Sequence, residues 1–304
     1  MAMVEIVEVG PRDGLQNQPQ ILSTDDKVIL IEKLIDAGAR RVEIASFVNP
    51  KLVPQMADGE EVISGVPPRT GLTRVGLVLN ERGLDRALAT DIEEIGALAV
   101  ATDSFGVRNQ KQTSLESVEI AGRIVERART AGRRAQVTIS VAFGCPFEGE
   151  VPEARVVEIA TALAKFRPRE IALADTIGVG APAQVQRLLC LVRERIGDIP
   201  LRCHFHNTRN TGLANAWAAY EAGVAILDSS MGGIGGCPFA PKATGNIATE
   251  DLVYLLERSG VKTGVNLSAL IQLSPWLADR LNVRELPAFV SRAGSFPNPQ
   301  RALA

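Results

Sequence analysis

Short runs rich in β-branched residues alternate with longer segments of helical periodicity along almost the whole chain. The short runs predict eight strands, at residues 4–9, 41–46, 74–79, 94–101, 136–141, 170–174, 201–206 and 225–229. The longer segments predict one helix after each strand, at residues 24–38, 55–65, 82–90, 115–131, 153–166, 182–196, 211–222 and 248–259. A regular alternation of this kind predicts a parallel sheet covered by helices.

The number of strand–helix units distinguishes between two parallel architectures. Eight units over about 260 residues favour an α/β fold of the (β/α)8 TIM barrel type, whereas an open doubly wound sheet more often stops at about five or six strands. We therefore predict one catalytic barrel domain over residues 1–265. Residues 266–304 form a short C-terminal extension of the same domain, helical to about residue 282 and irregular in the proline-rich tail.

Composition and charge exclude several classes of protein. Of the 304 residues, 46% are hydrophobic and 22% charged, which is typical of a folded globular chain. Lys and Arg number 33 against 35 Asp and Glu, so no overall basic field attracts nucleic acid or an anionic membrane. The start of the chain resembles neither a signal nor a transit peptide, and the four cysteines form no CxxC pair. We expect a reducing, cytoplasmic setting, with neither nucleic acid nor membrane as a partner.

The only two histidines, His204 and His206, stand in one His-x-His at the end of the seventh predicted strand. Residues i and i+2 of a strand point to the same face, and barrels carry their active sites at the carboxyl ends of the strands. Both imidazoles are therefore placed to bind one divalent metal ion. The alternative is a pair of polar residues satisfied inside the barrel. Cys203, between Arg202 and His204, should point outward and serve packing.

Other polar residues follow predicted strands at the same end. Arg12 and Asp13 come after strand one, Glu43 lies in strand two, Asp175 follows strand six, and Asn246 lies in the loop after strand eight. Asp13 is placed to reach the same metal, although an aspartate beside Gly14 is also common in turns.

The segment from Gly232 to Ala240 has four glycines in five positions, followed by Cys237. Glycine lets the backbone approach a ligand closely, and a thiol on such a loop can transfer a proton when the loop closes. Two alternatives stay open. The loop could bind phosphate, as loops after strands seven and eight of barrels often do, or Cys237 could be a passive turn residue.

Five segments resemble motifs of the 3-hydroxy-3-methylglutaryl-CoA lyase family. They are Glu8 to Asn17, Ser46 to Lys51, Gly144 to Gly149, Asp175 to Gly180, and Gly232 to Ala240 with Gly245-Asn246. The resemblance extends from about residue 4 to about residue 270, and the glycine–cysteine loop is its most specific part. It implies a metal-dependent barrel of the group that also contains isopropylmalate and homocitrate synthases.

The resemblance also implies roles for individual residues. Asp13, His204, His206 and Asn246 fall on the metal ligands of the family, which bind Mg²⁺ or Mn²⁺. Arg12 matches the arginine that stabilises the enolate, Cys237 the loop cysteine, and Glu43 an acidic residue close to the site. Asp13 is also a candidate base. The residues expected to contact substrate are Gln16, Arg108, Asn109 and Thr176.

The implied reaction is a retro-Claisen cleavage of 3-hydroxy-3-methylglutaryl-CoA, or of a close 3-hydroxy-3-alkylacyl-CoA. Its products are acetyl-CoA and a 3-oxo acid such as acetoacetate, as in leucine degradation, and the group suggests a homodimer. After His206 the family reads Asp-Thr, whereas this chain has Asn207, Thr208, Arg209 and Asn210, which leaves the acyl substrate open. The alternatives are a Claisen-type synthase of the same barrel group and a non-catalytic acyl-CoA-binding barrel.

Overall fold

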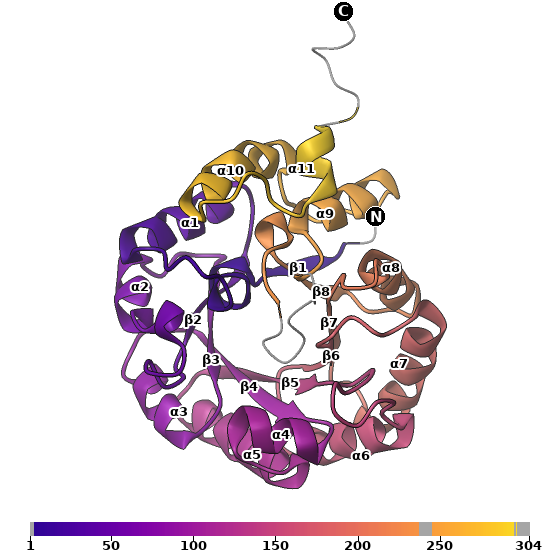
Figure 1. Ribbon diagram of the computed structural model, residues 1–304. Helices are drawn as coiled ribbons and strands as arrows, with labels where there is room; N and C mark the ends of the chain where they lie inside the picture. Colours follow the sequence, from indigo (N-terminus) through magenta and orange to yellow (C-terminus); the bar gives the residue numbers. More distant parts are fainter. Residues whose placement is uncertain (1–2, 237–244, 295, 297–304) are drawn as a thin grey trace, which may run out of the picture.

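Eight parallel strands close into a barrel in which each strand pairs with the next and β8 pairs with β1. The computed structural model describes residues 3–236, 245–294 and 296. Figure 1 looks down the barrel, with the helices forming a ring outside the strands. The strands are β1 (Glu5–Glu8), β2 (Arg41–Ser46), β3 (Thr73–Val78), β4 (Glu94–Val100), β5 (Arg134–Ser140), β6 (Ile171–Asp175), β7 (Leu201–Phe205) and β8 (Ile226–Ser229). The predicted TIM barrel is confirmed.

Most of the helices pack an apolar face against the strands, while the last two pack on other helices. The helices are α1 (Thr24–Asp36), α2 (Gly59–Gly65), α3 (Glu81–Leu88), α4 (Asp103–Gln110), α5 (Ser114–Thr130), α6 (Glu153–Ala164), α7 (Pro182–Ile196), α8 (Gly212–Glu221), α9 (Thr249–Arg258), α10 (Leu267–Arg280) and α11 (Phe289–Ala293). The longest, α5, begins at a capping box formed by Thr113 and Glu116 and buries Val118 and Val125. These faces and the strands form one continuous hydrophobic core.

Three elements depart from the sequence-based expectation. A π-helix, η1 (Gly10–Gly14), directly follows β1, and α4 precedes the predicted helix after β4. The tail beyond residue 282, expected to be irregular, contains α11, which packs on α9. The Asp251 carboxylate accepts the backbone N–H groups of Phe289 and Val290 at 3.1 and 2.7 Å, which fixes the start of α11. The helical part of the predicted extension is present as α10, whereas α11 replaces part of the tail that was expected to be irregular.

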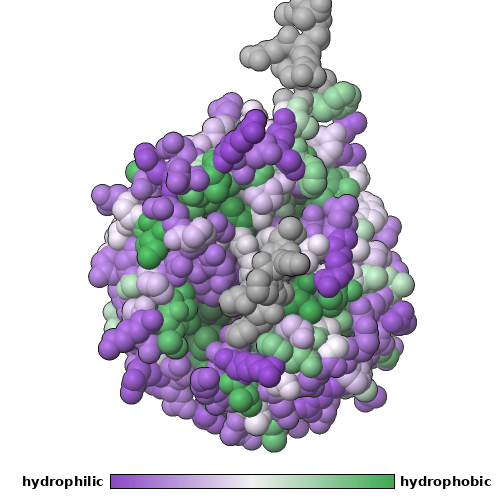
Figure 2. Space-filling model, in the orientation of Figure 1, coloured by the Kyte–Doolittle hydropathy of each residue, from purple (hydrophilic) through white to green (hydrophobic). Residues whose placement is uncertain are grey.

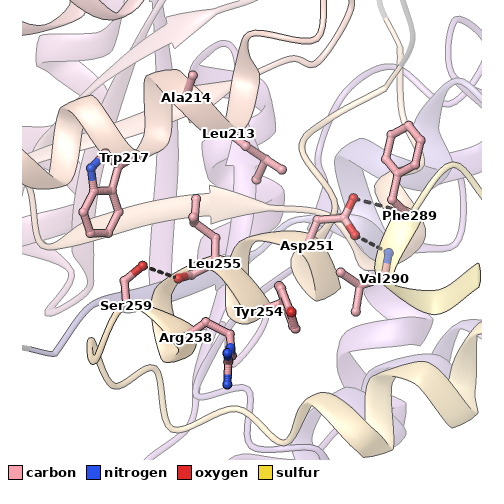
Figure 3. A pocket seen from close by; sticks show the side chains of 10 residues that line it. All are labelled: Leu213, Ala214, Trp217, Asp251, Tyr254, Leu255, Arg258, Ser259, Phe289 and Val290. Atoms are coloured by element: carbon pink, nitrogen blue, oxygen red, sulfur yellow. Dashed lines mark hydrogen bonds between the residues drawn. The ribbon is translucent and has the colours of Figure 1, made fainter. Parts of the chain in front are cut away.

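An apolar hollow of about 520 Å³ lies outside the barrel, between α8, α9 and α11. Figure 3 shows Leu213, Trp217 and Leu255 around it, with Asp251 turned toward the backbone of α11. None of the predicted metal ligands Asp13, His204, His206 and Asn246 lines this hollow, so it is separate from the predicted metal site. Among the described helices, none combines the length and apolar character that a membrane crossing requires.

Candidate active site

Asp13, His204 and His206 come together at the mouth of the barrel. Asp13 lies in η1, directly after β1, while His204 lies in β7 and His206 follows it. One ligand atom from each residue lies within 4.8 Å of those of the other two, and the imidazole centroids are 5.1 Å apart. A carboxylate and two imidazoles in this arrangement form a donor set that suits a divalent metal ion.

Asn246 completes the group from the loop after β8. Its backbone pairs with that of His206, and its Nδ2 donates to Asp13 Oδ2 at 2.7 Å and to the Ile234 carbonyl at 3.2 Å. Within the described residues, Asn246 Oδ1 and His206 Nδ1 are both buried without a hydrogen-bond partner. Buried polar atoms are rarely left in this state, and both offer electron pairs that a cation accepts. The residues therefore fit a bound metal.

His204 is oriented by a carboxylate on the next strand. Its Nδ1 lies 3.1 Å from Asp228 Oδ2, which leaves Nε2 as the ring nitrogen available to a metal. Metal-binding histidines usually donate their other ring N–H to such a partner, because this fixes the tautomer and the ring plane. Asp228 lies in β8, is buried, and also contacts Arg202. Sequence reasoning did not identify Asp228, because its role depends on a partner 24 residues away along the chain.

Arg12 joins Asp13 to Glu43. Its Nε and Nη2 donate to Glu43 Oε2 at 2.8 and 2.5 Å, and its Nη1 donates to Asp13 Oδ1 at 2.8 Å. Only 12% of the Arg12 side chain and 6% of the Glu43 side chain are exposed. The register between β2 and β3 shifts between Glu43 and Ala45, a local irregularity of the kind found beside active sites. The guanidinium is thus held at the edge of the cluster as a fixed positive charge.

Two members of the cluster, Asp13 and His206, have the protonation states that metal binding requires. Burial alone would raise the pKa of Asp13, but the Arg12 charge and the two histidines outweigh it and lower this pKa to about 2. Burial and the neighbouring His204 lower the pKa of His206 to about 4. Burial opposes protonation of His204 too, but the hydrogen bond to Asp228 prevails and raises its pKa. At neutral pH Asp13 is therefore an anion and His206 is neutral.

Glu8 is a second residue that the sequence did not reveal as special. Its carboxylate accepts the backbone N–H groups of Gly10 and Met231 at 2.7 and 2.9 Å, and the Thr249 hydroxyl at 2.6 Å. Burial raises the pKa of Glu8 to about 7. The side chain ties the end of β1 to η3 (Met231–Gly233) and to α9, and so supports the loop that leads toward Cys237.

The predicted substrate-contacting residues lie in several places. Gln16 is half-buried and its Oε1 has no partner among the described residues, while the Thr176 hydroxyl accepts the backbone N–H of Val141 at 2.8 Å. Arg108 and Asn109 are exposed on α4, where the Arg108 guanidinium lies 4.0 Å from the centre of the Phe147 ring.

Three further candidates from the sequence have different outcomes. Asp175 accepts the backbone N–H groups of Val179 and Gly180 at 2.9 and 3.0 Å, so it shapes the loop after β6. Cys203 is fully buried in the hydrophobic core, as a packing residue should be. Cys237 lies outside the described residues.

A cavity of about 400 Å³ adjoins Asn246. Asn207 and Arg209, two of the positions that depart from the family motif, contribute to its wall. The Arg209 Nη1 donates to the carbonyl oxygens of Ile177 and Gly178 at 3.1 and 3.0 Å, which holds this cation across the loop after β6. In the view of Figure 2 the surface is hollowed beside the centre, with hydrophobic residues along the hollow and mostly hydrophilic residues toward the rim.

Comparisons with known proteins identify the family of this chain. Residues 3–276 match the HMGL-like family. The chain is 45% identical to an (R)-citramalyl-CoA lyase from Chloroflexus aurantiacus, over 97% of this chain and 96% of that protein. It is 39% identical to the hydroxymethylglutaryl-CoA lyase YngG from Bacillus subtilis, over 94% of this chain and 95% of that protein.

Solved structures give the same result. The HMG-CoA lyase from Bacillus subtilis superposes with a TM-score of 0.93 at 38% identity, covering 96% of this chain and 98% of that one. An HMG-CoA lyase from Acinetobacter baumannii, solved with coenzyme A and 3-methylmalate, has a TM-score of 0.93 at 40% identity and covers 97% and 96% of the two chains. The chain therefore belongs to the HMGL-like family and is a carbon–carbon lyase of that family.

Proposed function

We propose that this chain cleaves 3-hydroxy-3-methylglutaryl-CoA, or a close 3-hydroxy-3-alkylacyl-CoA, to acetyl-CoA and an oxo acid in a metal-dependent retro-Claisen reaction. The observation that carries the proposal is the cluster of Asp13, His204 and His206, with Arg12 fixed beside it. The two buried, unpartnered acceptor atoms on His206 and Asn246 add to it.

Asp13, His204, His206 and Asn246 would hold Mg²⁺ or Mn²⁺. When bound, the metal would acidify the 3-hydroxyl group of the substrate and orient it. Asp13 or a histidine of the cluster takes the hydroxyl proton, since Asp13 and His206 are both unprotonated at neutral pH. The C2–C3 bond then breaks, C3 becomes a carbonyl, and the electron pair passes to the thioester enolate.

Arg12 places positive charge where the enolate oxygen develops negative charge. Its hydrogen bonds to Glu43 and Asp13 hold the guanidinium in place before substrate arrives, so no reorganisation is needed during the reaction. A proton delivered to C2 completes acetyl-CoA. We assign that delivery to Cys237, on the evidence of the glycine-rich sequence around it.

A second substrate of the same chemistry is (R)-citramalyl-CoA, which is cleaved by a relative that is 45% identical. Its carboxylate is attached directly to the hydroxyl-bearing carbon, one methylene shorter than in hydroxymethylglutaryl-CoA, and its oxo acid product would be pyruvate. Asn207 and Arg209, which depart from the family motif, change the polarity of the cavity beside Asn246. In that cavity a substrate whose acid is one methylene shorter would be distinguished from hydroxymethylglutaryl-CoA.

A substrate panel tests the proposal. Both acyl-CoA esters would be incubated with the metal-free chain and with added Mg²⁺ or Mn²⁺, and acetyl-CoA measured. We expect cleavage of one of them only with metal, and loss of most activity together with bound metal in the His204→Ala/His206→Ala variant. Binding of acyl-CoA without turnover would instead support a non-catalytic barrel. Condensation of acetyl-CoA with a 2-oxo acid and release of free CoA would support a synthase.

Cys237→Ser tests the proton-delivery role. Proton transfer by a positioned group contributes about 10²–10⁴-fold, so we expect a loss of turnover on that scale with metal binding unchanged. Alkylation of the thiol should also inactivate the enzyme, and acyl-CoA should slow that inactivation. Near-full turnover in the serine variant would favour the phosphate-binding interpretation of the loop.

We also propose a homodimer in a reducing, cytoplasmic setting. The dimer is inferred because barrels of this group commonly form dimers. The three cysteines among the described residues, Cys145, Cys190 and Cys203, are all free, which supports a reducing environment. Sedimentation equilibrium should give twice the chain mass of 32.5 kDa, and a monomer mass would contradict the dimer.

A further inference from the structure

Below the metal cluster the barrel interior contains an arginine, Arg202, that the reaction described above does not use. It lies in β7 two residues before His204, so its side chain is on the same inner face, one layer deeper. Only 3% of the residue is exposed. A cation at such a position is costly to bury unless several partners hold it, so its partners indicate its role.

Arg202 is held by groups from β5, from the residue before β6 and from β8. Its Nη2 donates to Gln136 Oε1 at 2.7 Å and to Thr138 Oγ1 at 3.0 Å, both on β5. Its Nε lies 2.9 Å from Glu170 Oε1, just before β6. With its position fixed from these sides, the remaining nitrogen has little freedom to move.

That nitrogen, Nη1, contacts both carboxylate oxygens of Asp228, at 2.8 Å for Oδ1 and 3.0 Å for Oδ2. Asp228 Oδ2 is also the atom that lies 3.1 Å from His204 Nδ1. The carboxylate therefore stands between the fixed guanidinium and the imidazole. The two contacts to Arg202 therefore oppose movement of the Asp228 carboxylate away from His204.

We propose that Arg202 is a positioning residue of the metal site, which acts through Asp228 to hold His204 with Nε2 presented to the metal. The inference rests on the proposed function, because it requires that the cluster of Asp13, His204 and His206 binds a divalent cation. Groups that orient metal ligands from behind typically change metal affinity by about 10–100-fold when they are altered.

The test compares two arginine-to-lysine variants. Arg202→Lys keeps the charge, but its ammonium cannot replace the separate guanidinium nitrogens that bond to Asp228 on one side and to Gln136 and Thr138 on the other. Arg74→Lys is the matched control, since Arg74 in β3 is also fully buried and pairs with an acid, Glu93, but has none of the partners of Arg202. Mn²⁺ titration of the purified chain should show binding weakened at least about tenfold in Arg202→Lys. Arg74→Lys should keep its affinity within about twofold, as an independent site would.

A double-mutant cycle tests the route through Asp228. If Arg202 acts only through that carboxylate, Arg202→Lys should cause no further loss in an Asp228→Asn background. Nitrogen chemical shifts of the His204 ring should also report a loss of the single tautomer in Arg202→Lys. Multiplicative losses in the double variant, or an unchanged Mn²⁺ affinity in Arg202→Lys, would overturn the inference.

The inference can still be tested if Arg202→Lys does not fold or if the wild-type chain binds no metal. If Arg202→Lys does not fold, Thr138→Val removes one bond to the guanidinium with little change of shape, and should still weaken Mn²⁺ binding; unchanged affinity would count against Arg202. A wild-type chain that binds neither Mn²⁺ nor Mg²⁺ would overturn the metal site itself and this inference with it. Wild-type binding with no effect of Arg202→Lys overturns the inference alone.

Discussion

Arg12 is bonded to two carboxylates at once, and this changes what its substitution would measure. Asp13 is a candidate ligand and Glu43 is almost fully buried, so removal of the guanidinium would leave both acids without their cation. Burial raises the pKa of Glu43, although the Arg12 charge counteracts part of the effect. A neutral substitution at Arg12 would therefore lower stability as well as activity, since an unpaired buried charge is costly.

Arg12→Lys separates the two effects. Lysine keeps the positive charge near Asp13 and Glu43 but cannot supply the three donors at their present positions. We expect kcat to fall by about 100-fold, the loss typical of one charge-stabilising donor, with a small change in melting temperature. Steady-state kinetics and thermal unfolding measure the two quantities. A change confined to KM would mean that Arg12 only binds substrate.

Asn246→Asp probes the metal site without an activity assay. Asn246 Nδ2 now donates to Asp13 Oδ2 at 2.7 Å, and an aspartate there would set two carboxylates against each other. We expect the metal-free variant to melt at a lower temperature than the wild type, and Mn²⁺ to raise its melting temperature by more than it raises that of the wild type. Asn246→Ala, which adds no charge, is the control. Equal Mn²⁺-induced shifts in all three proteins would argue that residue 246 does not face the metal.

The residues found from the sequence are those whose type and place were unusual. His204 and His206 are the only histidines, and Asp13 follows a strand in a glycine-containing turn, so each stood out. Glu8 and Asp228 sit within predicted strands among apolar residues and look like ordinary strand positions. Their importance depends on partners more than 20 residues away, which no local pattern reveals.

At the level of elements, a pair of buried acids joins β1, η3 and α9. Glu250 in α9 accepts the Gly232 N–H at 2.8 Å and the Ser291 hydroxyl at 2.9 Å, and Glu8 accepts the neighbouring Met231 N–H. Burial raises the pKa of each carboxyl from 4.5 to about 7. The folded chain therefore holds these protons more tightly than the unfolded chain does.

Stability should consequently fall as the pH rises through this range. The contribution of the two acids is fully present below pH 4.5 and is lost as the pH rises toward about 7, because the unfolded chain then releases protons that the folded chain retains. Glu250→Gln removes one titrating group, so its melting temperature should depend less on pH between these limits. Glu61→Gln, on the surface, is the control. Identical pH profiles for wild type and Glu250→Gln would contradict the assignment.

The elements predicted from the sequence are those with a strong periodicity. All eight strands were placed from β-branched runs, because each is buried on both faces. η1 was missed because Gly10 and Pro11 indicate a turn, and α4 because Gly106 interrupts a segment of only 8 residues. α11 was missed because the prolines around it suggested an irregular tail. Its position depends instead on bonds to Asp251, which lies in another helix.

The whole barrel is held together partly by charge, which its hydrophobic pattern does not reveal. Arg41 in β2 bonds to Glu170, before β6, and to Glu94 in β4, and Glu170 continues to Arg202 in β7. All four residues are at most 3% exposed. The chain of contacts crosses the interior of the barrel and reaches the metal site through Asp228. A barrel interior assembled in this way depends on every member having its partner.

Arg41→Met should therefore destabilise the entire domain. It would leave Glu170 with Arg202 and Glu94 with Arg169, each short of one partner in a dry interior. Breaking a buried pair typically costs about 3–5 kcal/mol. In a chain of this size that corresponds to a fall in melting temperature of roughly 5–8 °C. Arg123→Met, which removes a half-exposed pair with Glu81, should cost at most about 1 kcal/mol. Adding Glu94→Gln to Arg41→Met should recover part of the loss, because it removes one of the acids left short of a partner. Equal melting temperatures for the Arg41 and Arg123 variants would show that the interior charges carry no more stability than surface ones.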